Sequence, residues 1–567
     1  MTQTRTPTAT DRLAEQYFAA EITQSPLLAT YLGLPEGQDR YDDLSPAGLA
    51  AGAELAERTL RAAAGLTPID AVDEVTLAVL RERLGLRLET HAAGADLLSL
   101  NGIASGLHEL QEIHDLMPQS SDEDWALIAR RLRRLPSAID GWFAAQRAAI
   151  DAGLAPAARQ VTNLIEQCRG WSAPNGYFAA LGRAAGQRPE ALAKDLETGI
   201  LTAEQAFDRA ADRLAEQIGP QATEVDAVGR DRYLLASRFF LGTTIDIDQT
   251  YEWGLAEVAR VRAEMRATAE QIKPGASVRE AQQALEADPR YRLHGTAALR
   301  EWMQEHADEA VAAMVQGGHF AIPEAFRRIE CRIADTNSGC IYYSQPSNDL
   351  SRPGRMWWSV PQGVTDFGTW RELTTVYHEG VPGHHLQHVI AMANPDLNDW
   401  RRNGIWISGH CEGWALYAER LMAELGFHTD PGNLMGLLDA QALRAVRVVL
   451  DLGVHCELPA PEEVGGGRWD FDKAWQYFNR YVSMEPASAR FEVLRYFGWA
   501  GQAPSYRIGE RCWLELRAEV QRRQGAGFSL AHFHQTALEL GAVGLDTLRE
   551  AVLAAYDSAG AGQTAPR

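Results

Sequence analysis

Apolar residues recur with a helical period along most of this 567-residue chain. Between about residues 10 and 320 they fall three and four positions apart, as in DEVTLAVLRERLGLRLETHA (73–92) and QTYEWGLAEVARVRAEMRATAEQI (249–272). Ser45 before a proline is typical of a helix start, and Pro274 followed by glycine is typical of a helix end. The first part of the chain is therefore predicted to be helical.

The pattern changes between residues 330 and 361, where β-branched and aromatic runs are separated by Asn, Ser, Gly and Pro. A small antiparallel β-sheet is predicted for this segment. The helical period returns near residue 367 and continues almost to the end, with breaks at 457–469 and 498–505. We find no repeat of about 20 to 50 residues, so a solenoid is not indicated.

These patterns predict a mainly α-helical fold. We expect a helical N-terminal half over 1–320 and a second half over 321–557 that contains the sheet. Residues 558–567, SAGAGQTAPR, lack an apolar period and are predicted to form a flexible tail.

The composition indicates a folded globular protein, with 46% hydrophobic and 23% charged residues. The net charge of -22 repels phosphate backbones and anionic lipids, which makes nucleic acid and membrane surfaces poor partners. The opening residues MTQTRTPTATDRLAEQYF contain no apolar export segment, and no run of about 18 apolar residues indicates a membrane span. A cytoplasmic location is expected.

The cysteines are scattered and contain no C-x-x-C pair, which argues against a disulfide framework and against a cysteine zinc site. We expect reduced thiols. The six positions are Cys168, Cys331, Cys340, Cys411, Cys456 and Cys512.

The candidate chemistry is concentrated in a cluster of histidines. Five of the 15 histidines fall within a 33-residue stretch, followed closely by acidic residues. Zinc in a catalytic site needs three protein ligands and an open fourth position, and imidazoles with a carboxylate supply them. The five histidines are His378, His384, His385, His388 and His410.

The spacing of these histidines departs from the H-E-x-x-H pattern, because position 382 is Pro where a second His would stand. Pro382 has no N–H to donate to the carbonyl of His378, so a local bulge costs less here than in a regular helix. With two residues looped out, His384 takes the place of the second ligand. His385 is the competitor, since a spacing of seven residues also returns to the same helix face. We favour His384.

Two segments together resemble the signature of the bacterial domain-of-unknown-function-885 family: HEGVPGHHLQ (378–387) and EGWALYAE (412–419). RYFGWAGQAPSYRIG (495–509) is similar to another segment of that family, with Ala500 standing where the family usually has Pro. The resemblance covers most of the chain. It implies a large helical zincin-like fold with the active site at the floor of a central gorge, walled by the N-terminal half.

A more distant similarity to thimet oligopeptidase-like metallopeptidases aligns His384 with their second zinc ligand. In Taq carboxypeptidase-like enzymes the third ligand is a Glu followed by another Glu seven residues later, a spacing that Glu412 and Glu419 repeat. The resemblance therefore implies one zinc ion per chain, held by His378, His384 and Glu412. His385, Glu419 and His410 are alternates or partners that orient a ligand.

The remaining roles follow from the chemistry of zinc hydrolases. Glu379 is the candidate general base, and Tyr506 the donor to the oxyanion, with Tyr496 behind it. Simpler interpretations stay open for the other residues: His385, His388 and His410 are equally compatible with a satisfied core, and both tyrosines with packing. Cys411 on an apolar helix is expected to be inert.

The expected function is a zinc-dependent peptidase acting on short unstructured peptides. RMWWSVP (355–361) is predicted to be an edge strand that pairs with the extended substrate. Two alternatives remain: a metal-dependent hydrolase of a small amide or ester, and a non-catalytic binding protein with a zincin fold. The Glu at position 379 favours catalysis. The physiological substrate, the choice of exo- or endopeptidase, the oligomeric state and the identity of the divalent ion stay open.

Overall fold

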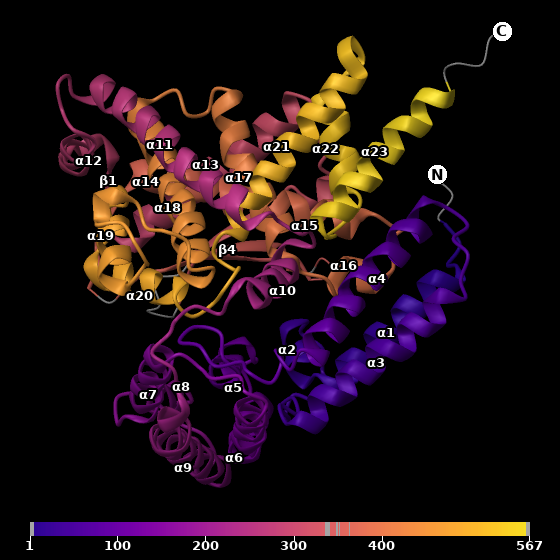
Figure 1. The fold of residues 1–567 in the computed structure, drawn as a ribbon, viewed down its shortest axis with the longest axis vertical. Coiled ribbons are helices and arrows are strands. Elements are labelled where there is room, and N and C mark those ends of the chain that lie inside the picture. The colour runs from indigo at the N-terminus through magenta and orange to yellow at the C-terminus, as the bar shows by residue number, and fades with distance from the viewer. Residues whose placement is uncertain (1–4, 335–340, 348–349, 351, 362, 563–567) are drawn as a thin grey trace.

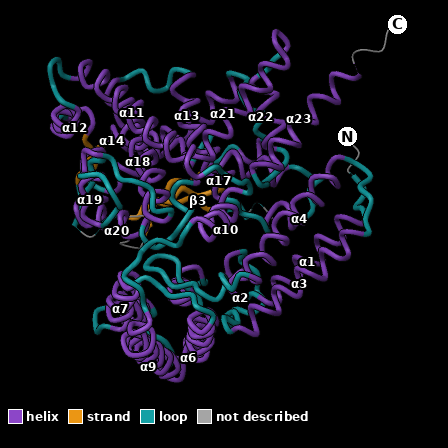
Figure 2. Tube along the Cα trace, in the orientation of Figure 1, coloured by secondary structure: helices purple, strands orange, loops and turns teal. Residues whose placement is uncertain are grey.

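Helices make up most of the protein in the computed structural model (Figure 1). The structure describes residues 5–334, 341–347, 350, 352–361 and 363–562. The strands are short and lie among the helices (Figure 2). The prediction of a mainly α-helical fold with a small sheet is therefore confirmed. Within the described ranges, no helix combines the length and apolar character that crossing a bilayer requires.

The first helices form a layer in which α1, α3 and α4 lie side by side (Figure 1). The predicted start of α3 is confirmed, because the Ser45 side chain accepts a hydrogen bond from the backbone N–H of Gly48. Leu77 and Leu80 of α4 share a hydrophobic core with Trp414 of α17. The bounds are α1 (Ala9–Gln24), α2 (Pro26–Tyr31), α3 (Pro46–Ala64) and α4 (Ala71–Ala92).

The next five helices surround a hydrophobic core of their own. Its buried residues, among them Trp125, Trp142 and Phe207, all fall between residues 100 and 218. This group lies at the bottom of Figure 1. The bounds are α5 (Gly106–Glu112), α6 (Asp122–Asp151), α7 (Ala158–Ser172), α8 (Tyr177–Ala184) and α9 (Glu190–Arg213).

Helices α10 to α13 pack against the second half of the chain. Tyr251 and Val258 of α11 share a core with Val448 and Val449 of α18, and Met265 shares another with Trp370. Helices on both sides of the predicted boundary at residue 320 therefore share the same hydrophobic cores. The bounds are α10 (Arg230–Leu241), α11 (Ile247–Ile272), α12 (Val278–Ala287) and α13 (Thr296–Gln316).

The strands of the described residues form two sheets, one of two strands and one of three. β1 pairs antiparallel with β5, and β3 pairs antiparallel with β4, while β2 joins the other side of β4 in parallel. The three-stranded sheet packs on α13 and α14 through Leu299, Met356 and Val376. The bounds are β1 (Arg292–His294), β2 (Ile329–Ala334), β3 (Ile341–Ser344), β4 (Gly354–Ser359) and β5 (Asp366–Gly368).

The prediction that residues 355–361 form an edge strand is wrong. β4 is the middle strand, in the order β2-β4-β3. Pro361 lies two residues beyond Ser359, the last residue of the strand, so its missing N–H removes no hydrogen bond from either ladder. The edges of this sheet are β2 and β3. Residues 335–340, 348–349 and 351 of the segment predicted as a sheet lie outside the described residues.

The last ten helices carry the site, and the chain breaks predicted at 457–469 and 498–505 separate α18 from α19 and α20 from α21. α23 continues to Gly562, so residues 558–562 of the expected tail are helical, and 563–567 lie outside the described residues. The bounds are α14 (Thr369–Glu379), α15 (His384–Ala393), α16 (Asp399–Asn403), α17 (Ser408–Glu424), α18 (Pro431–His455), α19 (Phe471–Tyr481), α20 (Pro486–Tyr496), α21 (Ser505–Gln524), α22 (Leu530–Leu538) and α23 (Leu545–Gly562).

Candidate metal centre

The segment predicted to bulge instead ends one helix and starts another. α14 ends at Glu379, and α15 begins at His384. The backbone N–H of Gly383 donates to the carbonyl of Tyr377 (3.0 Å), six residues back, which is two more than in a regular helix. Two residues are thus inserted relative to a regular helix, as expected around Pro382. They form a break between two helices, in which the Val381-Pro382 peptide bond is cis.

Gly383 allows the two helices to approach each other closely. A Cβ atom on this residue would lie 1.8 Å from the carbonyl oxygen of His378, a distance that no side chain tolerates. The approach brings the rings of His378 and His384 to a centroid separation of 4.8 Å. Trp414 of α17 holds the break in place, because its indole Nε1 donates to the carbonyl of Pro382 (2.8 Å).

Three potential ligands converge at this break. His378, His384 and Glu412 each present an atom, and these atoms all lie within 4.8 Å of one another. Glu412 Oε2 lies 3.3 Å from His378 Nε2 and 3.5 Å from His384 Nε2. Two ligand atoms about 2.1 Å from a tetrahedral zinc ion lie about 3.4 Å apart, so both distances suit zinc.

The donor chemistry of the cluster also fits a metal ion. Glu412 Oε2 is buried and has no hydrogen-bond partner in the described part of the chain, although two imidazoles face it. His378 donates from Nδ1 to Glu419 Oε1 (2.8 Å), and Glu419 Oε2 accepts from Thr374 Oγ1 (2.6 Å). This contact directs Nε2 of His378 towards Glu412, as carboxylates do behind metal-binding histidines.

Charges in the cluster depend on one another. Burial disfavours a charged His378, but its contacts with Glu412 and Glu419 raise its pKa to about 10. Burial also opposes the charge on Glu412, but contacts with His378 and His384 hold its pKa well below the usual range. A bound cation would replace the proton of His378 while preserving the attraction to Glu412.

His385 is turned away from this cluster. Its Nε2 donates to the carbonyl of Phe326 (2.8 Å), and its Nδ1 accepts from the hydroxyl of Tyr343 in β3 (2.9 Å). Both ring nitrogens are therefore occupied, one by strand β3 and one by the turn that precedes β2. Burial lowers the pKa of His385 to about 4, which keeps the ring neutral. The geometry thus brings His384, and not His385, beside His378 and Glu412.

A cavity of about 430 Å³ opens beside the triad. Glu379 lines it and is 7% exposed, and burial raises the pKa of its carboxyl group. The cavity also contains the aromatic side chains of the edge strand β3. The lining residues are Ile341, Tyr342, Tyr343, Thr375, His378, Glu379, His384, His388, Trp406, Glu412, Arg444, Arg447 and Tyr506.

Tyr506 reaches the cavity because α21 crosses α17 at small residues. A Cβ on Gly413 would lie 2.4 Å from the backbone of Gly509, so the two helices touch there. Ser408 and Ser505 also share a hydrogen bond between their hydroxyls (2.7 Å). Burial, with the charge of Glu412, raises the pKa of Tyr506, which keeps its hydroxyl protonated and able to donate.

Two predicted site residues, Tyr496 and His410, and the neighbouring Cys411 do not line the cavity. Tyr496 is wholly buried behind it, and its hydroxyl donates to Glu492 and accepts from Arg447 Nε (3.2 Å). His410 is buried against Trp513, with ring centroids 5.4 Å apart. Cys411 is buried, which raises the pKa of its thiol to about 12, as expected for an inert cysteine.

His388 does line the cavity, one helical turn after His384. Its ring is stacked between Trp406 (5.7 Å) and Tyr343 (5.6 Å). Burial lowers its pKa to about 3, so it is a neutral wall of the cavity.

The sequence interpretation missed two arginines, Arg444 and Arg447 of α18, which line the same cavity. A signal for them existed: they are the only charges in ALRAVRVVL (442–450), a stretch otherwise apolar and mostly buried. Charged residues in such a stretch are rarely buried unless they are paired or functional.

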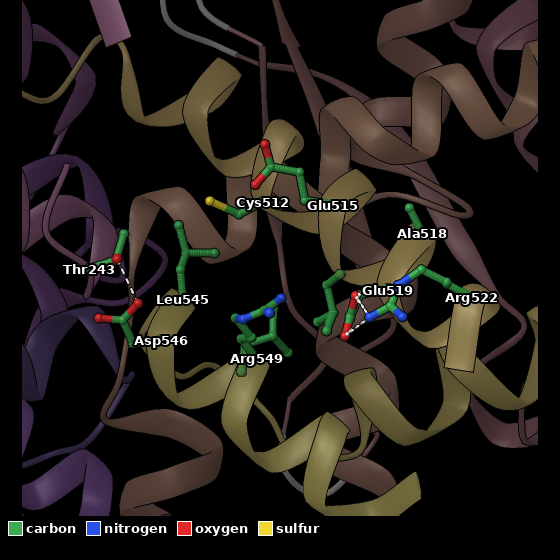
Figure 3. A pocket seen from close by; sticks show the side chains of 11 residues that line it. Thr243, Cys512, Glu515, Ala518, Glu519, Arg522, Leu545, Asp546 and Arg549 are labelled. Atoms are coloured by element: carbon green, nitrogen blue, oxygen red, sulfur yellow. Dashed lines mark hydrogen bonds and ion pairs between the residues drawn. The ribbon is translucent and has the colours of Figure 1, made fainter. Parts of the chain in front are cut away.

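A larger cavity of about 550 Å³ lies between α21 and α23 (Figure 3). Four of its polar residues form pairs with one another: Thr243 donates to Asp546 (2.6 Å), and Arg522 pairs with Glu519 (2.7 Å). Burial raises the pKa of Cys512 at its wall to about 12, so the thiol is not activated. The convergent chemistry of the triad has no counterpart in this cavity.

The cysteines agree with the expectation of free thiols, since all five described ones are unpaired. Cys340 lies outside the described residues.

Comparisons with known proteins concern the family and the fold. A crystal structure from Colwellia psychrerythraea, titled a "putative lipoprotein", superimposes with a TM-score of 0.82 at 22% identity, covering 97% of this chain and 99% of that one. A Shewanella oneidensis structure with the same description, of unknown function, gives 0.73 at 15% identity, covering 96% and 100%. No protein with a curated description matches. Residues 26–552 match the profile of a family described as bacterial protein of unknown function. The chain belongs to this family, DUF885.

Proposed function

We propose that this protein is a zinc-dependent peptidase that hydrolyses short, unstructured peptides. The observation that carries the proposal is the convergence of His378, His384 and Glu412 in one cavity with Glu379. Three ligands of this kind leave the fourth tetrahedral position for water or substrate. Zinc at such a site supplies Lewis acidity to the attacking water and to the scissile carbonyl.

The residues of the chain would then transfer the proton, bind the oxyanion and orient a ligand. Glu379 accepts a proton from the attacking water and delivers it to the leaving amine nitrogen as the C–N bond breaks. Tyr506, with its hydroxyl protonated, donates a hydrogen bond to the oxygen that becomes negatively charged. Glu419 holds the ring of His378 in its orientation.

A peptide is favoured as the substrate by the edge strand at the cavity. β3 contributes Ile341, Tyr342 and Tyr343 to the lining and leaves one side unpaired by any described strand. An extended chain can add to such an edge through backbone hydrogen bonds, with little sequence preference. Tyr342 and Trp406 are 42% and 53% exposed, and they provide apolar surface at the cavity.

The test combines metal analysis with a peptide library. We expect about one zinc ion per chain, turnover of unstructured peptides, and loss of turnover with a chelator. Folded proteins of similar content should resist cleavage. Turnover of a small amide or ester without any peptide cleavage would favour the small-molecule hydrolase instead. Zinc binding without turnover of any substrate would favour a binding protein.

A cytoplasmic location is also proposed, supported by the five free cysteines. The lipoprotein description of the two similar structures points to the alternative of an exported protein. Cell fractionation of the producing bacterium distinguishes the two.

A further inference from the structure

The two arginines at the cavity differ in what they contact. Arg447 is ion-paired with Glu492 (2.9 Å), and its guanidinium lies over the ring of Tyr506, 5.0 Å from the centroid. Among the described residues, Arg444 donates only to the carbonyl of Ala440 (3.2 Å), one turn earlier in its own helix. In the described part of the chain, no carboxylate forms an ion pair with Arg444.

An unpaired guanidinium is costly in this position. Arg444 is half-buried, and its Nε is fully buried without a hydrogen-bond partner among the described residues. Removing a charged group from water is unfavourable unless a partner compensates it. The chain carries 76 acidic residues against 54 basic ones, yet no described carboxylate forms an ion pair with this side chain. Glu379, Glu419 and Asp439 interact with its charge only at longer range. A compensating anion supplied by a ligand fits this arrangement.

The location of Arg444 indicates which ligand. It lines the same cavity as the triad and Glu379. The cavity volume of about 430 Å³ lies at the lower end of the range for small-molecule sites, about 300 to 1,000 Å³. It accommodates a small molecule or the end of a peptide.

We infer that Arg444 binds the terminal carboxylate of the substrate, so that the enzyme removes amino acids from the C-terminus of peptides or from N-acyl amino acids. This inference rests on the proposed function. A guanidinium forms paired hydrogen bonds with a carboxylate, whereas Arg447 is already occupied by Glu492. The residues before the cleaved bond would lie along β3.

The reaction is a hydrolysis that consumes one water. The water oxygen bonds to the carbonyl carbon of the last peptide bond, and the bond from that carbon to nitrogen breaks. One water proton passes through Glu379 to the leaving nitrogen. The products are a shortened chain with a new carboxylate and a free amino acid, which keeps the carboxylate that Arg444 binds.

The experiment compares two peptides that differ only at the C-terminus, one ending in a free acid and one in a primary amide. With the zinc-loaded protein, we expect kcat/KM to be about 10- to 100-fold higher for the acid, the usual effect of a charge-assisted hydrogen bond, and the first product to be the last amino acid. Arg444→Gln should abolish this preference by lowering kcat/KM for the acid alone. Arg444→Lys should restore part of it.

Arg490→Gln is the matched control, because Arg490 is exposed on α20 and does not line the cavity. It should keep the full preference for the acid. Thermal unfolding of each variant shows whether it is folded, and Arg444→Lys keeps the comparison valid if the Gln variant is not.

Two outcomes separate this inference from the proposed function. Cleavage of internal bonds at equal rates in acid and amide would overturn the inference and leave the peptidase in place. If neither peptide is cleaved, the proposed function fails, and calorimetry with the metal-free protein and the acid peptide decides the inference. Binding that weakens at least about 10-fold in Arg444→Gln supports the carboxylate site. Absent or unchanged binding overturns it.

Discussion

A substitution at Glu379 can separate metal binding from catalysis. It lines the cavity but is not among the three side chains whose ligand atoms converge. Glu379→Gln should therefore retain about one zinc per chain and the wild-type melting temperature while kcat falls by several orders of magnitude, because the base that accepts the water proton is removed. Elemental analysis and kinetics on a cleaved peptide check this. Near-normal turnover in the variant would contradict the assigned role.

Glu419 offers a test of how the site is organised behind the ligands. Glu419→Gln weakens the contact to His378 Nδ1, so zinc affinity should fall about 10- to 100-fold. Competition with a chromophoric chelator measures this. Glu424→Gln is the control, since Glu424 lies at the end of the same helix and pairs with Arg517 at the surface. An equal loss in both variants would mean that the effect is not specific to the His378 contact.

Asp451 predicts a pH dependence of stability that does not involve the metal site. Burial raises the pKa of its carboxyl group to about 7, although it accepts hydrogen bonds from Tyr233 (2.7 Å) and the N–H of Gly501 (2.9 Å). The neighbouring charge of Arg495 lowers the pKa only in part. Because the folded-state pKa lies above the unfolded value of about 3.9, the native state binds the proton more tightly. This stabilisation is complete below pH 4 and is lost as the pH rises to 7.

Asp451→Asn cannot ionise and keeps an acceptor for both donors. Its free energy of unfolding, relative to that of the wild type, should therefore increase from pH 4 to 7 and then level off, by at most about 1.4 kcal/mol per pH unit. Urea unfolding of both proteins across this range measures the difference. A difference that is constant with pH would show that Asp451 is not protonated in the native state.

Single residues were predictable from sequence where spacing within one segment sufficed. His378, His384 and Glu412 follow from two short motifs, and the structure brings them together. The partner of Arg447, Glu492, lies on another helix 45 residues away, so nothing local indicated that this arginine is paired while Arg444 is not. Glu492 lies one turn before Tyr496 in the same helix, but only packing shows that the Tyr496 hydroxyl contacts Glu492 and Arg447 and does not line the cavity.

At the scale of elements, helix bounds were predictable and strand pairing was not. α11 ends at Ile272, next to the predicted stop at Pro274. The position of β4 in the middle of its sheet depends on β2, which joins it in parallel through a connection that no local pattern specifies. The edge that faces the cavity is therefore β3, whose residues sequence reasoning assigned only to a sheet in general.

The break between α14 and α15 can be tested at Gly383. A Cβ there would collide with the carbonyl of His378, so Gly383→Ala must displace α15 and separate His384 from Glu412. We expect loss of zinc binding and lower stability. Gly85→Ala in α4 is the control, because a Cβ at that helical position meets nothing within 4 Å. It should stabilise the protein by about 0.5 to 1 kcal/mol. Zinc titration and thermal unfolding distinguish the two, and retained zinc binding in Gly383→Ala would contradict the requirement for this close approach.

At the scale of the whole molecule, the hydrophobic cores show which helices pack as one unit. Two of the five described clusters are confined to one segment of the chain: the core of α5 to α9, within residues 100–218, and the core of α13, α14 and the three-stranded sheet, within residues 299–376. The largest core joins α1, α3 and α4 to α17, the helix that carries Glu412. Sequence periodicity indicates where each helix has an apolar face but not which face it meets, so the division of the chain into halves could not be derived from it.

The triad joins α14, α15 and α17, which all contribute to this shared core. Metal removal should therefore lower the stability of the whole protein. Zinc at about 1,000 times its dissociation constant stabilises the folded state by about 4 kcal/mol. With an unfolding entropy of about 2.1 cal/mol/K per residue, a chain of 567 residues should lose about 3 °C in melting temperature when a chelator removes the metal. Differential scanning calorimetry with and without zinc measures the shift. Glu379→Gln should show the same shift, and His384→Ala should show none. A full shift in His384→Ala would mean that the stabilising metal is bound elsewhere.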